Sequence, residues 1–225
     1  MRIVGATKIY VLSPIDTTYE GPKVPLGEEQ EWQPVHLRQG SLDGACGPYS
    51  VMMALIICGV ANYEDARTLW DEDHRTRLGK LLRCWDTYGP LCRSGAGLWD
   101  LINSVSEAYG KVLESDFTTG DPGPETRGFI EKHVNENHAV ILRVTFSGGS
   151  HWVVVVGLEY GMKEGEPVLW RYLVLDPAEE TPTVSAWNGV IGARSSPGPY
   201  PYRWWTAQLR MVTLSEAFAL WAKKQ

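Results

Sequence analysis

Residues 139–177 read AVILRVTFSGGSHWVVVVGLEYGMKEGEPVLWRYLVLDP. This stretch contains three β-rich runs, at 139–146, 151–160 and 168–176, separated by segments that contain glycine. Runs of this kind joined by short glycine-containing links predict successive antiparallel strands. The middle run carries four consecutive valines, Val153–Val156, and is therefore apolar on both faces. We expect it at the centre of a sheet.

Helical patterns dominate the chain before these strands. Residues 47–58 are almost wholly apolar, with Pro48 suited to a first helical turn and Gly59 suited to a helix end, which predicts a buried helix. Three further helical segments are predicted at 63–85 (in one or two pieces), 97–109 and 124–136. Helices followed by a sheet indicate an α+β fold.

The two ends of the chain carry weaker patterns. A short strand is predicted within residues 3–12, and the Pro- and Gly-rich residues 13–34 predict an extended arm or loop. A strand is expected at 111–117. After Asp176 we predict a loop at 188–203, a strand near 208–213 and a helix at 215–224 that Ser215 caps.

Composition narrows the classes of protein. The net charge is -6 and no basic run is present, so nucleic acid is not an expected partner. No signal peptide and no membrane-spanning segment are recognisable. We therefore expect a cytoplasmic protein, or one that is secreted without a signal peptide, and no cofactor. The oligomeric state stays open.

The cysteines and histidines indicate neither a disulfide scaffold nor a metal site. Four cysteines in 225 residues are too few for a scaffold, although Cys84 and Cys92 can be either ordinary thiols or a loop-closing disulfide. No metal is expected, because four histidines lack the spacing of a ligand set and are interpreted as surface residues. These four are His36, His74, His133 and His138, of which the last two are five positions apart.

Three residues combine into a candidate catalytic site. Cys46 lies at the start of the predicted helix 47–58, where unpaired N–H groups and the helix dipole favour a thiolate. His151 opens the central strand, and Asp176 ends the next one. A hairpin between these strands brings His151 and Asp176 together, so that the carboxylate can orient the imidazole. This arrangement predicts nucleophilic catalysis by Cys46 with His151 as base.

The same residues resemble a family. Residues 39–53, QGSLDGACGPYSVMM, followed by His151-Trp152-Val153-Val154 and Asp176-Pro177, are similar to papain-like cysteine peptidases. They are most similar to bacterial peptidases that remove double-glycine leader peptides and to the stand-alone relatives of those enzymes. The resemblance implies an N-terminal catalytic helix packed on an antiparallel sheet. It also implies that Gln39 donates to the oxyanion.

The resulting prediction is one papain-like hydrolase domain over 1–225, with a catalytic core at about 35–180, an arm at 1–34 and an extension at 181–225. The substrate is expected to be a peptide or protein with a peptide or isopeptide bond to cleave. Gly47 is a predicted substrate contact because it lets a substrate approach the backbone closely. Trp99 and Trp152 are predicted to line the groove, since tryptophans often line peptide-binding grooves.

Two other functions fit the same residues. Papain-like sites also catalyse acyl transfer or transpeptidation, because an amine can capture the acyl-enzyme instead of water. Alternatively, the chain is a peptide-binding module whose site no longer reacts, with recognition by its tryptophans. Six of these stand where they could line a groove: Trp32, Trp99, Trp152, Trp187, Trp204 and Trp205.

Overall fold

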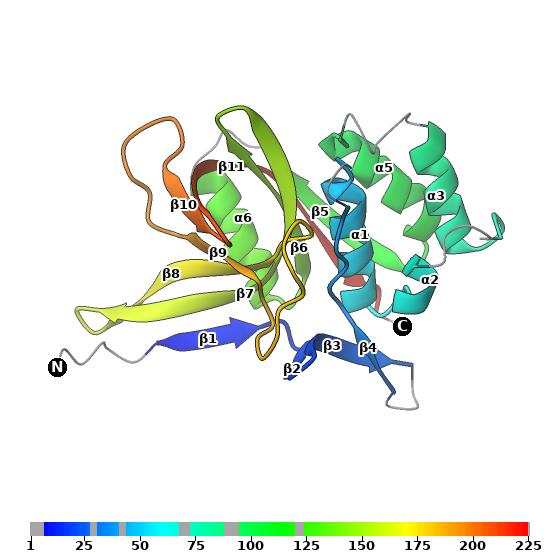
Figure 1. Cartoon of the computed structure of the whole chain (residues 1–225), viewed down its shortest axis with the longest axis horizontal. Coiled ribbons are helices and arrows are strands. Elements are labelled where there is room, and N and C mark those ends of the chain that lie inside the picture. Colours follow the sequence, from blue (N-terminus) through cyan, green and yellow to red (C-terminus); the bar gives the residue numbers. More distant parts are fainter. Residues whose placement is uncertain are drawn as a thin grey trace.

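The computed structural model describes residues 7–27, 31–40, 44–67, 73–87, 95–119 and 124–224. Helices and antiparallel sheets are both present, which confirms the predicted α+β class. Figure 1 shows most of the helices gathered on one side of a large curved sheet. The helices are α1 (Cys46–Ile57), α2 (Tyr63–Arg67), α3 (Arg77–Thr87), α5 (Leu98–Tyr109) and α6 (Pro124–Asn135).

The large sheet has eight strands, and six of them form a closed ring. The strand order is β1-β7-β6-β11-β10-β9-β8, β8 also pairs with β7, and β5 pairs with β11. Strands β6 to β11 therefore form a closed, barrel-like ring in which each has two neighbours. The strands are β1 (Lys8–Val11), β5 (Leu113–Thr118), β6 (Ala139–Phe146), β7 (Gly149–Lys163), β8 (Glu166–Leu175), β9 (Gly189–Gly192), β10 (Tyr202–Trp205) and β11 (Leu209–Ala222).

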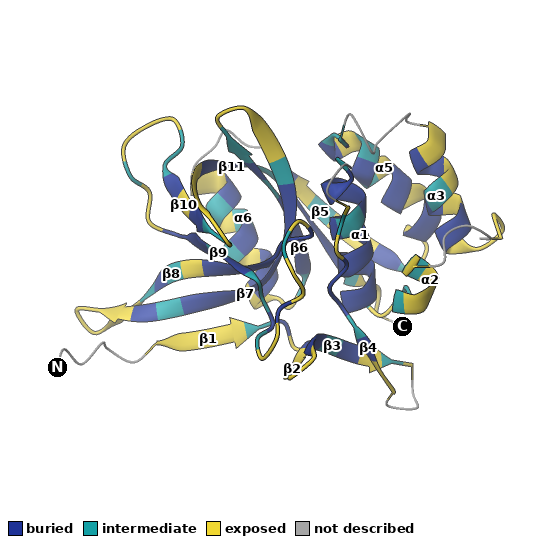
Figure 2. Ribbon diagram, in the orientation of Figure 1, coloured by how far each residue is buried: buried dark blue, intermediate teal, exposed yellow. Residues whose placement is uncertain are grey.

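Helix α1 packs against β7 and β6 of this sheet and against α5. Its residues are buried except Tyr49, which is half-buried, as the dark blue ribbon in Figure 2 illustrates. An apolar surface on every side is what a helix enclosed between a sheet and other helices requires. The predicted helix at 47–58 and the predicted strands at 139–146, 151–160 and 168–176 thus agree with α1, β6, β7 and β8 to within a few residues.

Three predictions outside this core are wrong. Residues 13–34 are not only an arm, because β2 (Asp16–Thr18), β3 (Gly21–Leu26) and β4 (Glu31–Pro34) form a second, three-stranded sheet. The predicted loop at 188–203 contains β9 and the start of β10. The glycines and prolines in these two segments mark links between short paired strands: β2, β3 and β4 pair with one another, whereas β9 pairs with β8 and β10.

The predicted helix at 215–224 is also wrong, since these residues belong to strand β11. Residues 217–222 pair with β5 on one side, and residues 213–220 pair with β6 on the other. Burial of Ala217 to Leu220 between two neighbouring strands overrides the helical propensity of their alanines and leucine. In the described part of the chain, no helix is long and apolar enough to cross a lipid bilayer.

Candidate active site

Cys46 is the first residue of α1, directly after Ala45. Its side chain is buried, and burial by itself disfavours the thiolate. The hydrogen bond and charge of His151, together with the backbone N–H groups of Trp152 and Gly47, outweigh that cost and lower the pKa of the Cys46 thiol below its ordinary value. The structure therefore holds Cys46 in surroundings that favour its reactive form.

His151 lies near the start of β7, and Asp176 directly follows β8. The two strands pair from Val154 and Leu175 onwards, with two bulges along the way, and this pairing brings both residues to one end of the hairpin. Nε2 of His151 lies 2.7 Å from Oδ1 of Asp176, which is an ordinary hydrogen-bond distance. Because Nε2 engages the carboxylate, Nδ1 is the ring atom left for Cys46.

The imidazole is poised to hold a proton. Burial opposes the charged form, but the hydrogen bonds to Asp176 and to Cys46 raise the pKa of His151 to about 9. The lowered pKa of the thiol and the raised pKa of the imidazole both favour a thiolate–imidazolium pair over the neutral pair. The ring of Trp204 stacks on His151, with centroids 5.7 Å apart and planes 25° apart, so that the imidazole is held between aromatic and carboxylate groups.

A network of hydrogen bonds holds Asp176 in place. Its Oδ1 also accepts the backbone N–H of Ala178 at 2.8 Å. The Asn188 side chain accepts the backbone N–H of Asp176 at 2.7 Å and donates to the Asp176 carbonyl at 2.9 Å. Nε2 of His36 lies 2.9 Å from the same carbonyl, and its Nδ1 lies 3.0 Å from the Thr181 hydroxyl. The Asp176 peptide is therefore fixed from three directions.

The sequence interpretation did not identify His36 or Asn188 as part of the site. His36 was expected at the surface, but it is 2% exposed, and its burial lowers its pKa, which keeps it neutral. Asn188 stands before Gly189 in what resembled a loop. The signal that could have found His36 is its place between the apolar Val35 and Leu37 in the segment that leads to Gln39.

Gln39 lies close to the candidate site through its backbone. Its N–H donates to the carbonyl of Pro177, the residue after Asp176, at 2.8 Å. Its side-chain Oε1 is buried and has no hydrogen-bond partner among the described residues. Such an orphan polar atom is costly unless something else satisfies it. The direction of this amide relative to the Cys46 sulfur stays a prediction.

The three predicted substrate contacts differ in their surroundings. Trp152 is buried and its Nε1 donates to the carbonyl of Ala96 at 2.9 Å, so its ring presents no surface to a substrate. A Cβ at Gly47 would meet the side chains of Ala96 and Leu101 at 3.2 Å, so close helix packing explains this glycine. Trp99 is 53% exposed and makes an edge contact with Phe117, so it remains available to a ligand.

The other cysteines lie outside this arrangement. Cys58 donates to the carbonyl of Leu220 at the far end of α1, and burial raises its pKa to about 12. Burial, followed by the nearby Glu107, also raises the pKa of Cys84, which is a free thiol. The predicted alternative of a disulfide to Cys92 concerns a residue outside the described part of the chain.

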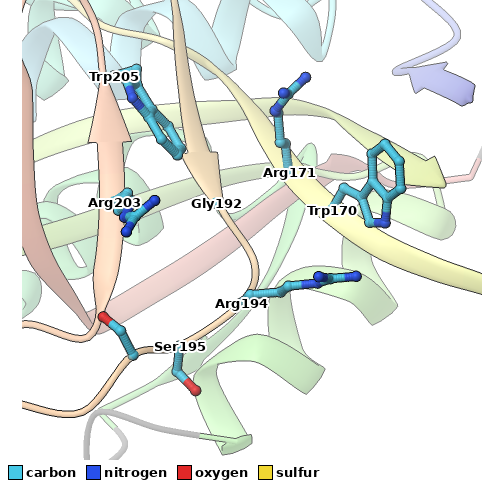
Figure 3. A pocket seen from close by; sticks show the side chains of 8 residues that line it. Trp170, Arg171, Gly192, Arg194, Ser195, Arg203 and Trp205 are labelled. Carbon is cyan, nitrogen blue, oxygen red and sulfur yellow. The ribbon is translucent and has the colours of Figure 1, made fainter. Parts of the chain in front are cut away.

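A separate hollow of about 480 Å³ lies on the strands β8, β9 and β10. Figure 3 shows the side chains along its rim, with arginines and tryptophans on most of it and serine at one edge. Its lining contains no cysteine, histidine or carboxylate, so its serine hydroxyls have no general base among the lining residues to activate them. The lining residues are Trp170, Arg171, Gly192, Arg194, Ser195, Ser196, Arg203 and Trp205.

No protein-family model matches the chain, and no curated protein sequence matches it. Among solved structures, the chain is similar to UfSP from C. elegans, with 16% sequence identity and a TM-score of 0.46. That similarity covers 100% of this chain and 35% of the other, so the chain spans about a third of the length of this solved relative.

Proposed function

We propose that the protein is a papain-like cysteine hydrolase that cleaves a peptide or isopeptide bond in a peptide or protein. The observation that carries this proposal is the part-buried hydrogen bond of 2.7 Å between His151 and Asp176, beside a Cys46 thiol whose pKa the same imidazole lowers. A thiol at a helix start, a base on one strand and a carboxylate after the next strand form the arrangement expected of a Cys-His-Asp triad.

In the first half of the proposed reaction, the Cys46 thiolate attacks the carbonyl carbon of the scissile bond and forms a tetrahedral intermediate. The C–N bond then breaks, and the proton on Nδ1 of His151 moves to the leaving nitrogen. The product that departs is the amine, and the acyl group remains on Cys46 as a thioester.

In the second half, water attacks the thioester carbonyl while Nδ1 of His151 accepts a proton from it. The C–S bond breaks, the carboxylic acid product leaves, and the thiolate–imidazolium pair is restored. Asp176 keeps the ring in the orientation needed for both halves and stabilises its positive charge. The hydrogen bonds of Asn188 and His36 to the Asp176 peptide make these two side chains positioning residues in this proposal.

We assign the oxyanion donors to Gln39 and to the backbone N–H of Cys46. The unpartnered Oε1 of Gln39 supports this role, because the O and N atoms of an amide exchange places by a 180° turn. After that turn, the buried side-chain N–H of Gln39 would have no acceptor until the oxyanion of the substrate accepted its hydrogen bond. The cost of the orphan atom in the free protein would then be relieved in the transition state.

A cleavage assay with single-residue variants tests the proposal. With a substrate found in a peptide-library screen, Cys46→Ala should lower kcat at least about 10³-fold, equivalent to about 4 kcal/mol of transition-state stabilisation. Cys84→Ala is the matched control and should retain activity. If Cys46→Ala still turns the substrate over at the wild-type rate, the hydrolase proposal fails. Added amines would divert the acyl group to amide products if the enzyme is an acyltransferase.

A further inference from the structure

Two histidines and a glutamate meet where α6 ends and β6 begins. The chain turns sharply there: Asn137 has a φ of +68°, and the N–H of His138 bonds to the carbonyl of His133 at 2.9 Å. This turn ends α6 with a left-handed residue and returns the chain over the last helical turn. As a result, Nδ1 of His133 and Nδ1 of His138 lie 3.0 Å apart.

The Glu136 carboxylate completes the cluster. Its Oε2 lies 3.7 Å from Nδ1 of His138 and 4.0 Å from Nδ1 of His133. In a tetrahedral Zn²⁺ site, metal–ligand bonds of about 2.0–2.2 Å place neighbouring donor atoms about 3.3 Å apart. The three observed separations lie within several tenths of an ångström of that value, so small side-chain movements suffice to form the site.

We propose that His133, Glu136 and His138 bind one divalent transition-metal ion of the Zn²⁺ type. Two imidazole nitrogens and one carboxylate oxygen form a donor set that suits zinc, with a fourth position for water. The sequence interpretation placed both histidines at the surface and expected no metal. His133 is in fact 1% exposed, and its burial points to a role inside the fold.

A second carboxylate orients His133 for this role. Nε2 of His133 lies 3.1 Å from Oδ2 of Asp116 on β5, so the ring donates its Nε2–H there and presents the lone pair of Nδ1 to the cluster. Such carboxylate–histidine pairs commonly support metal-bound histidines. His138 is fixed by Trp221, whose ring stacks on it with centroids 4.1 Å and planes 9° apart.

The surrounding charges also favour a cation. Besides Glu136 and Asp116, a third carboxylate lies nearby: that of Glu114, which accepts the Trp221 indole N–H at 2.9 Å. The nearby cation is Lys132, whose Nζ lies 3.6 Å from Asp116. Three carboxylates against one ammonium leave the site negative.

The cluster is separate from the candidate active site. His138 precedes the first residue of β6, whereas Val144, which pairs with His151, lies near the other end of that strand. Six residues of extended strand correspond to about 20 Å. A metal here would join the end of α6 to β6 and, through Asp116, to β5, so we expect it to stabilise the fold.

Metal titration of chelator-treated protein tests the proposal. Cys46→Ala should be the background, because this thiol could itself bind zinc, and Co²⁺ serves as a spectroscopic probe before competition with Zn²⁺. We expect one equivalent to bind with the visible absorption of tetrahedral Co²⁺. His138→Asn and Glu136→Gln should each weaken binding at least about 100-fold, and Asp116→Asn about 10–100-fold. His74→Asn, an exposed histidine elsewhere, should bind normally.

Thermal unfolding provides a second readout. Zn²⁺ should raise the Tm of the background protein and of His74→Asn, because a ligand that binds only the folded state stabilises it. The same addition should leave the Tm of His138→Asn unchanged. The site assignment is overturned if no stoichiometric metal binds, or if His138→Asn and Glu136→Gln bind as tightly as the background. Circular dichroism of the metal-free variants establishes that they are folded.

Discussion

The reactivity of Cys46 towards a small alkylating reagent should exceed that of Cys58 by at least about 10³-fold at pH 7. Only the thiolate reacts, and a pKa of about 12 for Cys58 leaves about 10⁻⁵ of that thiol ionised. A thiol with a pKa of 9.0 is about 1% ionised at this pH. The pKa of Cys46 lies below 9.0, so the ratio of the two thiolate fractions is at least about 10³.

Substitution of His151 by alanine is the perturbation that tests the cause. In the wild type, the thiolate exists above the lowered pKa of Cys46 and is paired with the imidazolium up to about pH 9. His151→Ala removes the largest contribution that opposes burial and leaves only the backbone N–H groups of Trp152 and Gly47, so the pKa of Cys46 should rise. Labelling at pH 7 should then slow at least about tenfold and rise about tenfold per pH unit between pH 7 and 8.

The assay is iodoacetamide labelling read by peptide mass spectrometry across pH 6–10, with protein unfolded in denaturant as the control for equal intrinsic reactivity. Asp86→Ala, an exposed substitution on α3, is a matched control that should label like the wild type. The reasoning is refuted if His151→Ala leaves the rate and pH profile of Cys46 unchanged, or if Cys58 reacts as fast as Cys46 in the folded protein.

Three further outcomes are expected. The raised pKa of His151 stabilises the folded state by an amount that is fully present below about pH 6.5 and is lost as the pH rises through about 9. Urea titrations should detect a loss of at most about 3 kcal/mol in the free energy of unfolding over this range. The ionisation of Cys46 should offset part of this loss, and the loss should be smaller in His151→Gln. Asn188→Ala removes both bonds to the Asp176 backbone and should lower kcat about tenfold with KM unchanged, whereas a change in KM alone would argue against a positioning role. Gly47→Ala places a methyl group 3.2 Å from Leu101 and should cost about 1–3 kcal/mol of unfolding free energy; an unchanged urea midpoint would contradict this.

The centre of the fold could be predicted because its signals are local. The strands from Ala139 to Leu175 follow one another as hairpins, so periodicity and glycine-containing links suffice to place them. The hairpin of β7 and β8 in turn brings His151 and Asp176 to one end. The helix start at Cys46 follows from Pro48 and the apolar run behind it.

The remaining features depend on contacts that are distant in the sequence. Strand β11 looks helical by composition, but its partners β5 and β6 lie about 70 to 110 positions earlier. His36 reaches the carbonyl of Asp176 across 140 positions, and no local pattern predicts such a contact. The approach of His133 to His138 depends on the left-handed conformation of Asn137, and asparagine permits that conformation without demanding it.

The central claim is that Cys46 forms a covalent acyl intermediate. The direct measurement is intact-protein mass spectrometry of an acid-quenched reaction with an activated ester or peptide substrate, followed by peptide mapping. The account predicts an added mass equal to the acyl part of the substrate, located on Cys46, that disappears on further incubation and is absent in Cys46→Ala. Turnover without any adduct on Cys46, at a rate that Cys46→Ala retains, would contradict it.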